Sequence, residues 1–249
     1  MMEGKDRYIT GKHPVLEGLK IKGIIWEIFV QRGTEGNLKE LTGEAEKAGI
    51  RVRSLDKKEM DNLSSGVLHQ GVIARTAPFK YGEMDDIFKL ALERGEDPFI
   101  VVLDHIEDPH NLGAIARSAE GAGAHGVIIP EKRSADITPI VYKVSSGAVF
   151  HIPVVKVINI ANTVTALKER GVFAAGLDMA EESYTEKDLT GPLALVVGAE
   201  GKGLSRLVKE KCDYVVSIPM MGEIQSLNAS NAASVLLYEI RRQRDEGKI

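Results

Sequence analysis

The stretch FIVVLDHIEDPHNLGAIARSAEGAGAHGVIIP, residues 99–130, decides the fold of this chain of 249 residues. It opens with the apolar run 99–103, continues into a segment with helical spacing at 111–123, and closes with the apolar run GVIIP at 126–130. Both runs are apolar throughout, which is typical of strands buried on both faces of a sheet. Two such strands joined by a helix predict a parallel β-sheet that is covered by helices.

The same alternation of strand and helix continues to the end of the chain, which predicts an α/β fold with a mainly parallel sheet. We expect strands at IPVVKV (152–157), VFAAGLD (172–178), LALVVG (193–198) and YVVSIP (214–219), and helices at 84–94, 138–147, 160–170, after Gly203 and up to about Arg244. In such sheets ligands bind beyond the carboxyl ends of the strands. The loops after Leu103, Gly198 and Pro219 are therefore the first places to look for a site.

The front of the chain reads as a small α/β unit of its own. The apolar runs GIIWEIFV (23–30), IRVRSL (50–55) and GVIARTA (71–77) alternate with helical segments. The stretch PFKYGE that follows combines proline, glycine and charge in the manner of a linker. We expect one domain over residues 1–79 and a second over residues 80–249.

Composition excludes several classes of protein. With 43% hydrophobic and 27% charged residues, the chain is neither disordered nor collagen-like nor a coiled coil. Its apolar runs are far shorter than the ~20 residues that cross a bilayer, and the N-terminus lacks the apolar core of a secretion signal, so we expect no membrane partner and a cytoplasmic location. The single cysteine, Cys212, cannot form an internal disulfide and is expected to be buried and unreactive.

The net charge of −4 argues against binding nucleic acid through a generally basic surface. The charge is uneven, however: residues 1–80 carry 14 basic against 11 acidic residues, and residues 81–249 carry 18 against 25. One basic group in the first part contains Arg51, Arg53, Lys57 and Lys58. Ordinary solvated surface charge explains this asymmetry as well as a binding surface does.

Three patterns in the second part invite assignments that their context does not support. GAGAHG at 121–126 has the G-x-G-x-x-G spacing of a dinucleotide site, but it closes a helix instead of opening one, which favours a helix C-cap. GAEGKGLS lacks the spacing of a phosphate-binding loop. His105 and His110 lie five apart in a turn with Pro109, which is no metal-ligand spacing, so no metal is expected.

The first candidate site lies at the start of the helix predicted at 111–123. Asn111 is a good N-cap for that helix. Arg117 follows six residues later among small residues that permit close approach of a ligand. An arginine on such a helix, beginning at the carboxyl end of a strand, suits phosphate binding, although a plain surface arginine is the alternative.

The second candidate is the loop in VVGAEGKGLS, where Gly198, Gly201 and Gly203 allow positive φ and close approach of the backbone to a ligand. Glu200 in this loop is either a functional acid or only an acid near a helix N-terminus. The third candidate, SIPMMGEIQSLNASNAASVLLYEI, leads from a strand into the final helix, with Ser226 as its N-cap and Asn228 in its first turn.

Three stretches of the chain resemble, in their order, the three signature motifs of the SpoU, or TrmH, family of RNA 2′-O-ribose methyltransferases in the SPOUT superfamily. They are NLGAIARSAEGAGAHGVIIP, LVVGAEGKGLS and SIPMMGEIQSLNASNAASVLLYE. The resemblance spans residues 99–244. The front, with YITGKHPVLEGL and HQGVIA at 69–74, resembles the family's small RNA-binding domain. The sequence is most similar to the branch that methylates a guanosine of 23S ribosomal RNA.

The resemblance implies a SPOUT domain with a trefoil knot, S-adenosylmethionine bound among the loops of the knot, RNA as substrate and a homodimer. It places the catalytic residues at Asn111, Arg117, Glu200, Ser226 and Asn228. It places the cofactor against Gly198, Ala199, Ile218, Met220 and Leu227. The family's proposed base falls on Arg117, but a guanidinium is a poor proton acceptor, so binding phosphate or stabilising an alkoxide is the easier role.

Other functions remain open on sequence grounds. The same catalytic motifs serve a transfer RNA ribose methyltransferase, and only the front domain favours ribosomal RNA. A non-catalytic RNA-binding assembly factor would keep the fold, but the complete set of motif residues argues against it. A nucleotide-binding oxidoreductase rests on GAGAHG alone and fails on context. Neither DNA nor a nicotinamide cofactor is expected.

Overall fold

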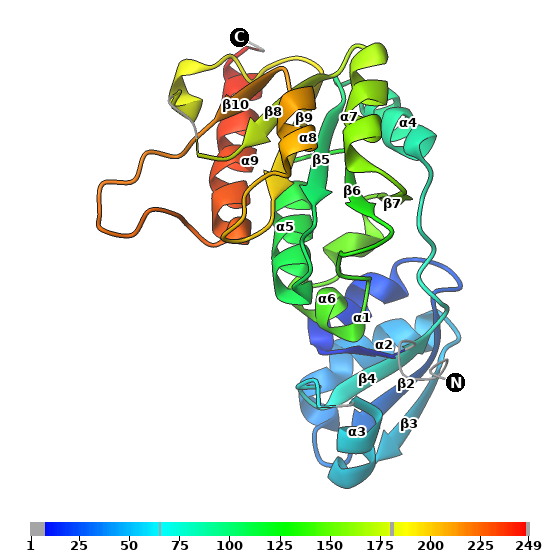
Figure 1. The fold of residues 1–249 in the computed structure, drawn as a ribbon. Helices are drawn as coiled ribbons and strands as arrows, with labels where there is room; N and C mark the ends of the chain where they lie inside the picture. Colours follow the sequence, from blue (N-terminus) through cyan, green and yellow to red (C-terminus); the bar gives the residue numbers. More distant parts are fainter. Residues whose placement is uncertain (1–7, 65, 180–181, 248–249) are drawn as a thin grey trace. The chain divides into compact units, whose positions relative to one another are not determined.

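The computed structural model describes residues 8–64, 66–179 and 182–247 (Figure 1). The chain forms two compact units. The first contains Met1–Lys80 and Asp136–His151, and the second contains Tyr81–Ala135 and Ile152–Ile249. The domain limits 1–79 and 80–249 stay a prediction. The structure adds that residues 136–151 pack with the first unit.

The first unit is built on a four-stranded sheet in the order β1-β4-β2-β3, in which β2 and β3 are parallel and the other pairs antiparallel. Its strands are β1 (Tyr8–Thr10), β2 (Ile25–Gln31), β3 (Arg51–Leu55) and β4 (Val72–Thr76). Its helices are α1 (Lys12–Leu19), η2 (Glu35–Leu38), α2 (Lys39–Lys47), α3 (Lys57–Ser64), α6 (Pro139–Val144) and η3 (Ala148–Phe150).

The two faces of this sheet are covered differently. On one face α1 lies close to the strands, because Gly18 brings the helix backbone against the Ile9 side chain, and α2 packs beside α1. On the other face Met60 of α3 packs against Phe29 and Ile73, which form a small apolar cluster. The sequence pattern of short strands and helices is confirmed.

Tyr142 explains why residues 136–151 belong to this unit. Its side chain is buried, its ring stacks on Phe150 at 5.0 Å between centroids, and it meets Phe79 edge-on at 6.1 Å. The helix predicted at 138–147 is shorter than expected. It ends before Gly147, whose φ of 89° is not helical.

The second unit has a six-stranded sheet in the order β10-β8-β9-β5-β6-β7, with every pair parallel. Its strands are β5 (Phe99–Asp104), β6 (Gly126–Pro130), β7 (Val154–Val157), β8 (Phe173–Leu177), β9 (Leu193–Gly198) and β10 (Tyr214–Val216). Its helices are α4 (Met84–Arg94), α5 (Pro109–Gly121), α7 (Ile160–Glu169), η4 (Tyr184–Glu186), α8 (Arg206–Lys211) and α9 (Ala229–Glu246).

Helices cover both faces of this sheet, as the apolar strands require (Figure 1). Ile87 of α4, Val164 of α7 and Val208 of α8 pack with strand side chains on one face. On the other face α5 and α9 pack against each other, α5 against β6 and α9 against β9. The predicted α/β fold with a parallel sheet is confirmed, and the trefoil knot stays a prediction. None of the helices in the described part of the chain has the length and apolar character needed to cross a membrane.

Two predicted helix caps are wrong, and both errors have a local cause. Asp108, not Asn111, caps α5, because Pro109 suits the first helical position and the Asp108 carboxylate accepts the amide of His110 at 2.8 Å. Asn228, not Ser226, caps α9, because the helix begins at Ala229. The GAGAHG stretch does close a helix as predicted. Its Gly123 has a φ of 80° just beyond the end of α5.

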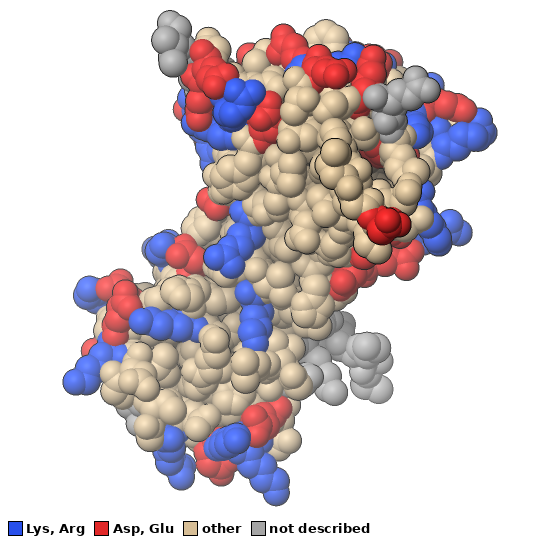
Figure 2. Space-filling model, turned by 90° about the vertical axis from the view of Figure 1, so that its left-hand side faces the viewer, with Lys and Arg blue, Asp and Glu red and all other residues tan. Residues whose placement is uncertain are grey.

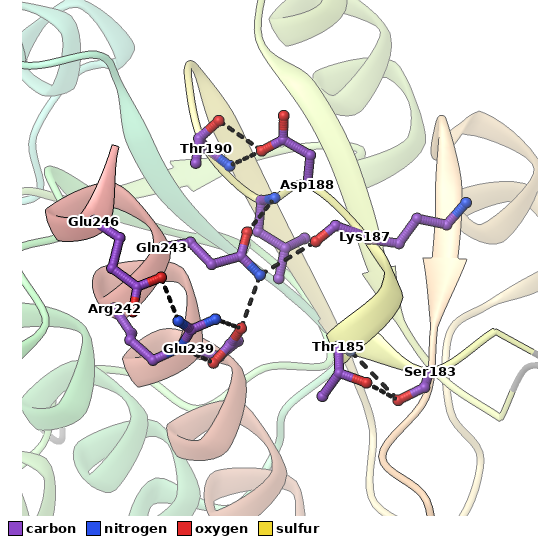
Figure 3. A network of polar contacts seen from close by, with 10 residues as sticks. Ser183, Thr185, Lys187, Asp188, Thr190, Glu239, Arg242, Gln243 and Glu246 are labelled. Atoms are coloured by element: carbon purple, nitrogen blue, oxygen red, sulfur yellow. Dashed lines mark hydrogen bonds and ion pairs between the residues drawn. The ribbon is translucent and has the colours of Figure 1, made fainter. Parts of the chain in front are cut away.

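The last turns of α9 are anchored by polar contacts (Figure 3). Gln243 accepts the backbone amide of Leu189 at 2.8 Å and donates to the carbonyl of Lys187 at 3.2 Å. Arg244 donates to the carbonyls of Asp97 at 3.0 Å and Pro98 at 3.1 Å. These contacts fix the end of α9, whose start lies at the candidate site.

Candidate functional site

Loops from the carboxyl ends of several strands meet in the second unit and line two adjoining cavities. The first cavity, of about 230 Å³, is lined by Leu177, Asp178, Met179, Val197, Gly198, Ala199, Glu200, Gly201, Lys202, Gly203, Ser217, Ile218, Met220, Gln225, Ser226, Leu227, Ala229 and Ala232. The second, of about 460 Å³, is lined by Asp104, His105, Ile106, Glu107, Asp108, Asn111, Arg133, Ala199, Glu200, Lys202, Gly203, Leu204 and Ser205. The three loops singled out in the sequence therefore do come together.

The glycine-rich loop after β9 folds back tightly on itself. Ala199 and Gly203 exchange backbone hydrogen bonds at 3.1 and 2.9 Å. Gly201 and Gly203 have positive φ values of 72° and 65°, as predicted. Gly198 is required for a different reason, because a Cβ there would lie 2.2 Å from the carbonyl carbon of Gly203.

Asp104 fixes this loop from the end of β5, and the sequence analysis did not single it out. Its carboxylate is buried, accepts the amide of Ser205 at 2.7 Å and lies 2.6 Å from Nδ1 of His105. His105 has a positive φ of 62°, a conformation that is uncommon outside glycine. An acid at the last position of a buried strand was the available signal, since buried carboxylates need partners.

Glu200 joins the first and third candidate segments. One oxygen of its carboxylate, Oε2, accepts hydrogen bonds from Nδ2 of Asn111 and from Nδ2 of Asn228, both at 3.2 Å. Residues 89 and 28 positions away in sequence thus meet at one atom. A carboxylate shared by two amides orients both side chains.

Asn228 uses the other end of its amide to start α9. Its Oδ1 accepts the backbone amide of Ser230 at 2.9 Å, the hydroxyl of Ser230 at 2.6 Å and the amide of Asn231 at 3.4 Å. The N-terminus of the last helix and the Glu200 contact therefore depend on the same side chain. Ser226, two residues earlier, is exposed and lines the first cavity.

Arg117 lies apart from this cluster. Six residues along a helix correspond to roughly 9 Å of rise and roughly 240° of rotation, so Arg117 cannot share the face of Asn111. The side chain is exposed and lines neither cavity. Within the described residues it has no hydrogen-bond or ion-pair partner, which leaves its guanidinium donors available.

The predicted cofactor residues all line the first cavity: Gly198, Ala199, Ile218, Met220 and Leu227. The cavity also receives Leu177 and Met179 from the end of β8, which sequence reasoning did not select although the strand itself was predicted. Backbone groups and apolar side chains dominate its wall. Asp178 is held by Lys209 at 3.1 Å and by the amide of Met179 at 2.7 Å.

Cys212 is half-buried instead of buried as expected. Burial, and then the nearby Asp213 carboxylate, raise the pKa of its thiol to about 12. A thiol that stays protonated at neutral pH is a poor nucleophile, so the chain's only cysteine has no catalytic character.

Two family models match the chain. Residues 98–238 match the SpoU rRNA Methylase family, and residues 8–82 match the substrate-binding domain of RNA 2′-O ribose methyltransferases. Between them they cover the motifs in the second unit and the strands and helices α1 to α3 of the first.

Individual relatives agree with these models. The chain is 44% identical to the Bacillus subtilis (strain 168) protein YacO, assigned to the TrmH family of tRNA/rRNA methyltransferases, over 98% of each chain. It is similar to the SpoU methyltransferase AviRb from Streptomyces viridochromogenes in complex with AdoMet, with a TM-score of 0.78, 28% identity and coverage of 96% of this chain and 91% of that one. A solved RNA 2′-O ribose methyltransferase has a TM-score of 0.75 and 29% identity, over 96% of this chain and 89% of that one.

Proposed function

Because the chain belongs to the SpoU family of RNA methylases, we propose that it transfers a methyl group from S-adenosylmethionine to the 2′-hydroxyl of a guanosine ribose in 23S ribosomal RNA. The observation that supports this most is the Glu200 carboxylate, which holds Asn111 and Asn228 beside a cavity suited to the cofactor. RNA as substrate also implies a cytoplasmic enzyme.

The first cavity fits S-adenosylmethionine in its chemistry. Apolar side chains such as Ile218 and Leu227 suit an adenine ring, and the tight backbone at Gly198 and Ala199 offers amides and carbonyls to a bound nucleoside. The acids Asp178 and Glu200 suit a cationic ligand. When bound there, S-adenosylmethionine supplies an activated methyl group.

The chain's own residues would position the RNA ribose and stabilise its reacting oxygen. Glu200 fixes the amides of Asn111 and Asn228, so that the ribose meets prearranged polar groups, and positioning of this kind lowers a barrier. A guanidinium is a poor proton acceptor, so we assign Arg117 to an RNA phosphate or to the oxyanion that forms at the ribose. Ser226 shapes the wall of the cavity.

We propose a homodimer as the working form. On the outer side of α9, Val235 and Tyr238 lie one turn apart and are 37% and 55% exposed. Figure 2 faces the side on which α9 lies in Figure 1 and shows a broad uncharged area on the second unit. Sedimentation of the full chain tests this, and a monomer at micromolar concentration contradicts it.

The target is tested by mapping 2′-O-methylation at nucleotide resolution in RNA from cells with and without this gene. Loss of one guanosine mark in 23S ribosomal RNA is the expected result. Loss of a transfer RNA mark would support the methyl transfer to a ribose and refute 23S ribosomal RNA as the substrate. If no mark is lost, the purified protein is assayed for transfer of a labelled methyl group to total RNA. Absence of transfer in that assay would overturn the proposal.

A further inference from the structure

One half of the first unit's sheet is left open by the helix that covers the other half. Tyr8, Arg75, Glu27 and Arg51 lie opposite one another on the four paired strands and so form one row across the sheet. The neighbouring row contains Phe29, which packs against Met60 of α3. Among the described residues, α3 covers Phe29 in the second row, whereas Arg51 and Arg75 of the first row and Arg53 at the end of the second are exposed.

Three arginines surround a single acid on this open half. Arg51, Arg53 and Arg75 are all exposed, whereas Glu27 is only 8% exposed. The guanidinium groups of Arg53 and Arg75 each lie 3.7 Å from a Glu27 oxygen, which is longer than a direct hydrogen bond. One carboxylate thus holds two guanidinium groups in place without occupying their donors, and the cluster carries an excess of positive charge.

Aromatic rings lie among these arginines. Trp26 occupies an irregularity in the pairing of β2 with β4 and is 45% exposed. The guanidinium of Arg75 lies 5.9 Å from the centre of its ring, and that of Arg53 lies 5.9 Å from the centre of the Phe29 ring. Tyr8 lies beside Phe29 at 6.4 Å between centroids. Planar groups and cations therefore alternate across the strands.

We propose that this arginine face, formed by Tyr8, Trp26, Glu27, Arg51, Arg53 and Arg75, binds a single-stranded segment of the RNA substrate. Exposed guanidinium groups suit phosphates, and an exposed indole together with guanidinium planes suits bases that are free to stack. Bases inside a duplex are already stacked on one another, which favours a loop or bulge as the occupant. The proposal rests on RNA being the substrate of this chain.

Trp26 is the only tryptophan in the chain, so its fluorescence reports on this face directly. The full chain is titrated with a single-stranded RNA oligonucleotide of mixed sequence and with the same oligonucleotide annealed to its complement. Binding is measured in parallel by anisotropy of labelled RNA. Saturable quenching of Trp26 by the single strand, and weak quenching by the duplex, is expected. RNA binding without a change in Trp26 emission, equal quenching by the duplex, or no binding overturns the proposal.

Matched variants separate the roles of charge and stacking. Arg51→Gln removes a guanidinium that forms no ion pair or side-chain hydrogen bond among the described residues. It should lower the slope of log Kd against log salt by roughly 0.7, the value for one phosphate on a single strand. Lys39→Gln on α2 removes the same charge from an exposed helix position and should leave RNA affinity unchanged. Equal effects of the two variants contradict the proposal.

Trp26→Ala should weaken RNA binding by about 5- to 150-fold, the range for one stacked base, and Trp26→Phe should restore most of that affinity. Affinity unchanged in a folded Trp26→Ala protein overturns the stacking role. Failure of this proposal can be told apart from failure of the proposed function. If RNA quenches Trp26 but no methyl group is transferred, the arginine face is supported and the proposed function is refuted. If methyl transfer occurs without quenching, the proposed function is supported and the arginine face is refuted.

Discussion

In the second unit the candidate site lies beyond the strand ends, where loops meet around Glu200, whereas in the first unit the arginine face lies on the strands themselves. The site in the second unit is a cavity walled by backbone groups and apolar side chains, beside which Glu200 holds the amides of Asn111 and Asn228. The arginine face exposes guanidinium groups and rings on an open surface. Taken together, the two proposals give a division of labour, in which the second unit positions the reacting groups and the first holds RNA.

Arg117 gives the strongest test of this division, because it is a cation on the second unit that lies outside both cavities. Arg117→Ala should lower methyl transfer by at least about 100-fold, the loss typical of one donor to a developing oxyanion. Cofactor affinity, measured by calorimetry, should stay unchanged. Near-normal turnover would remove Arg117 from the reaction, and weakened cofactor binding would place it in the cavity instead.

Gly198→Ala tests whether the cavity in the second unit binds the cofactor. Its new Cβ would meet the Gly203 backbone and displace the loop, and this overpacking should lower the free energy of unfolding by roughly 1–3 kcal/mol. The displaced loop should also bind the cofactor more weakly, because Gly198 and Gly203 line the cavity. Gly222→Ala is the matched control, because nothing lies within 4 Å of a Cβ at Gly222. Calorimetry with S-adenosylmethionine should separate the two variants, and equal affinities would contradict the assignment of this cavity to the cofactor.

A smaller effect distinguishes a helix cap at the site from one outside it. Asn228→Ala and Asn159→Ala each remove the N-cap of a helix, α9 and α7, and each should lower the free energy of unfolding by about 0.5–2 kcal/mol. Only Asn228→Ala should also lower turnover, since Asn228 contacts Glu200. Denaturant unfolding measures the loss of stability, and a methyl-transfer assay measures the turnover. Equal turnover in the two variants would show that Asn228 acts only as a helix cap.

The smallest effect concerns Cys212. Its pKa is raised by burial from an ordinary 9.0 to about 12, so its stabilising contribution is present below pH 9 and is lost as the pH rises from about 9 to 12. At pH 8 the native thiol should react with iodoacetamide much more slowly than the thiol of the unfolded chain. Equal rates would show that the packing around β8 opens readily.

The sequence predicted the elements with strong periodicity and failed where a choice between neighbouring residues decided the structure. The helix expected at 84–94 spans Met84–Arg94, and the apolar strands form the expected parallel sheet. The caps were misplaced by two or three residues, because Asp108 and Asn228 each stood near an equally suitable side chain.

Long-range contacts lay beyond the sequence for a different reason. The meeting of Asn111, Glu200 and Asn228 depends on strand order, which no local pattern encodes. The packing of Tyr142 with the first unit depends on contacts across more than 60 residues of sequence. The arginine face requires the register of four strands, so Arg51 and Arg53 appeared in the sequence only as part of a basic group.

The division of labour is tested most directly by kcat and KM for methyl transfer as RNA is varied at saturating cofactor. Glu200→Gln should lower kcat about tenfold or more, since it weakens a charge-assisted contact in the site, and leave KM for RNA unchanged. Arg51→Gln should raise KM for RNA and leave kcat unchanged. A loss of kcat in Arg51→Gln, or a rise in KM alone in Glu200→Gln, would contradict it.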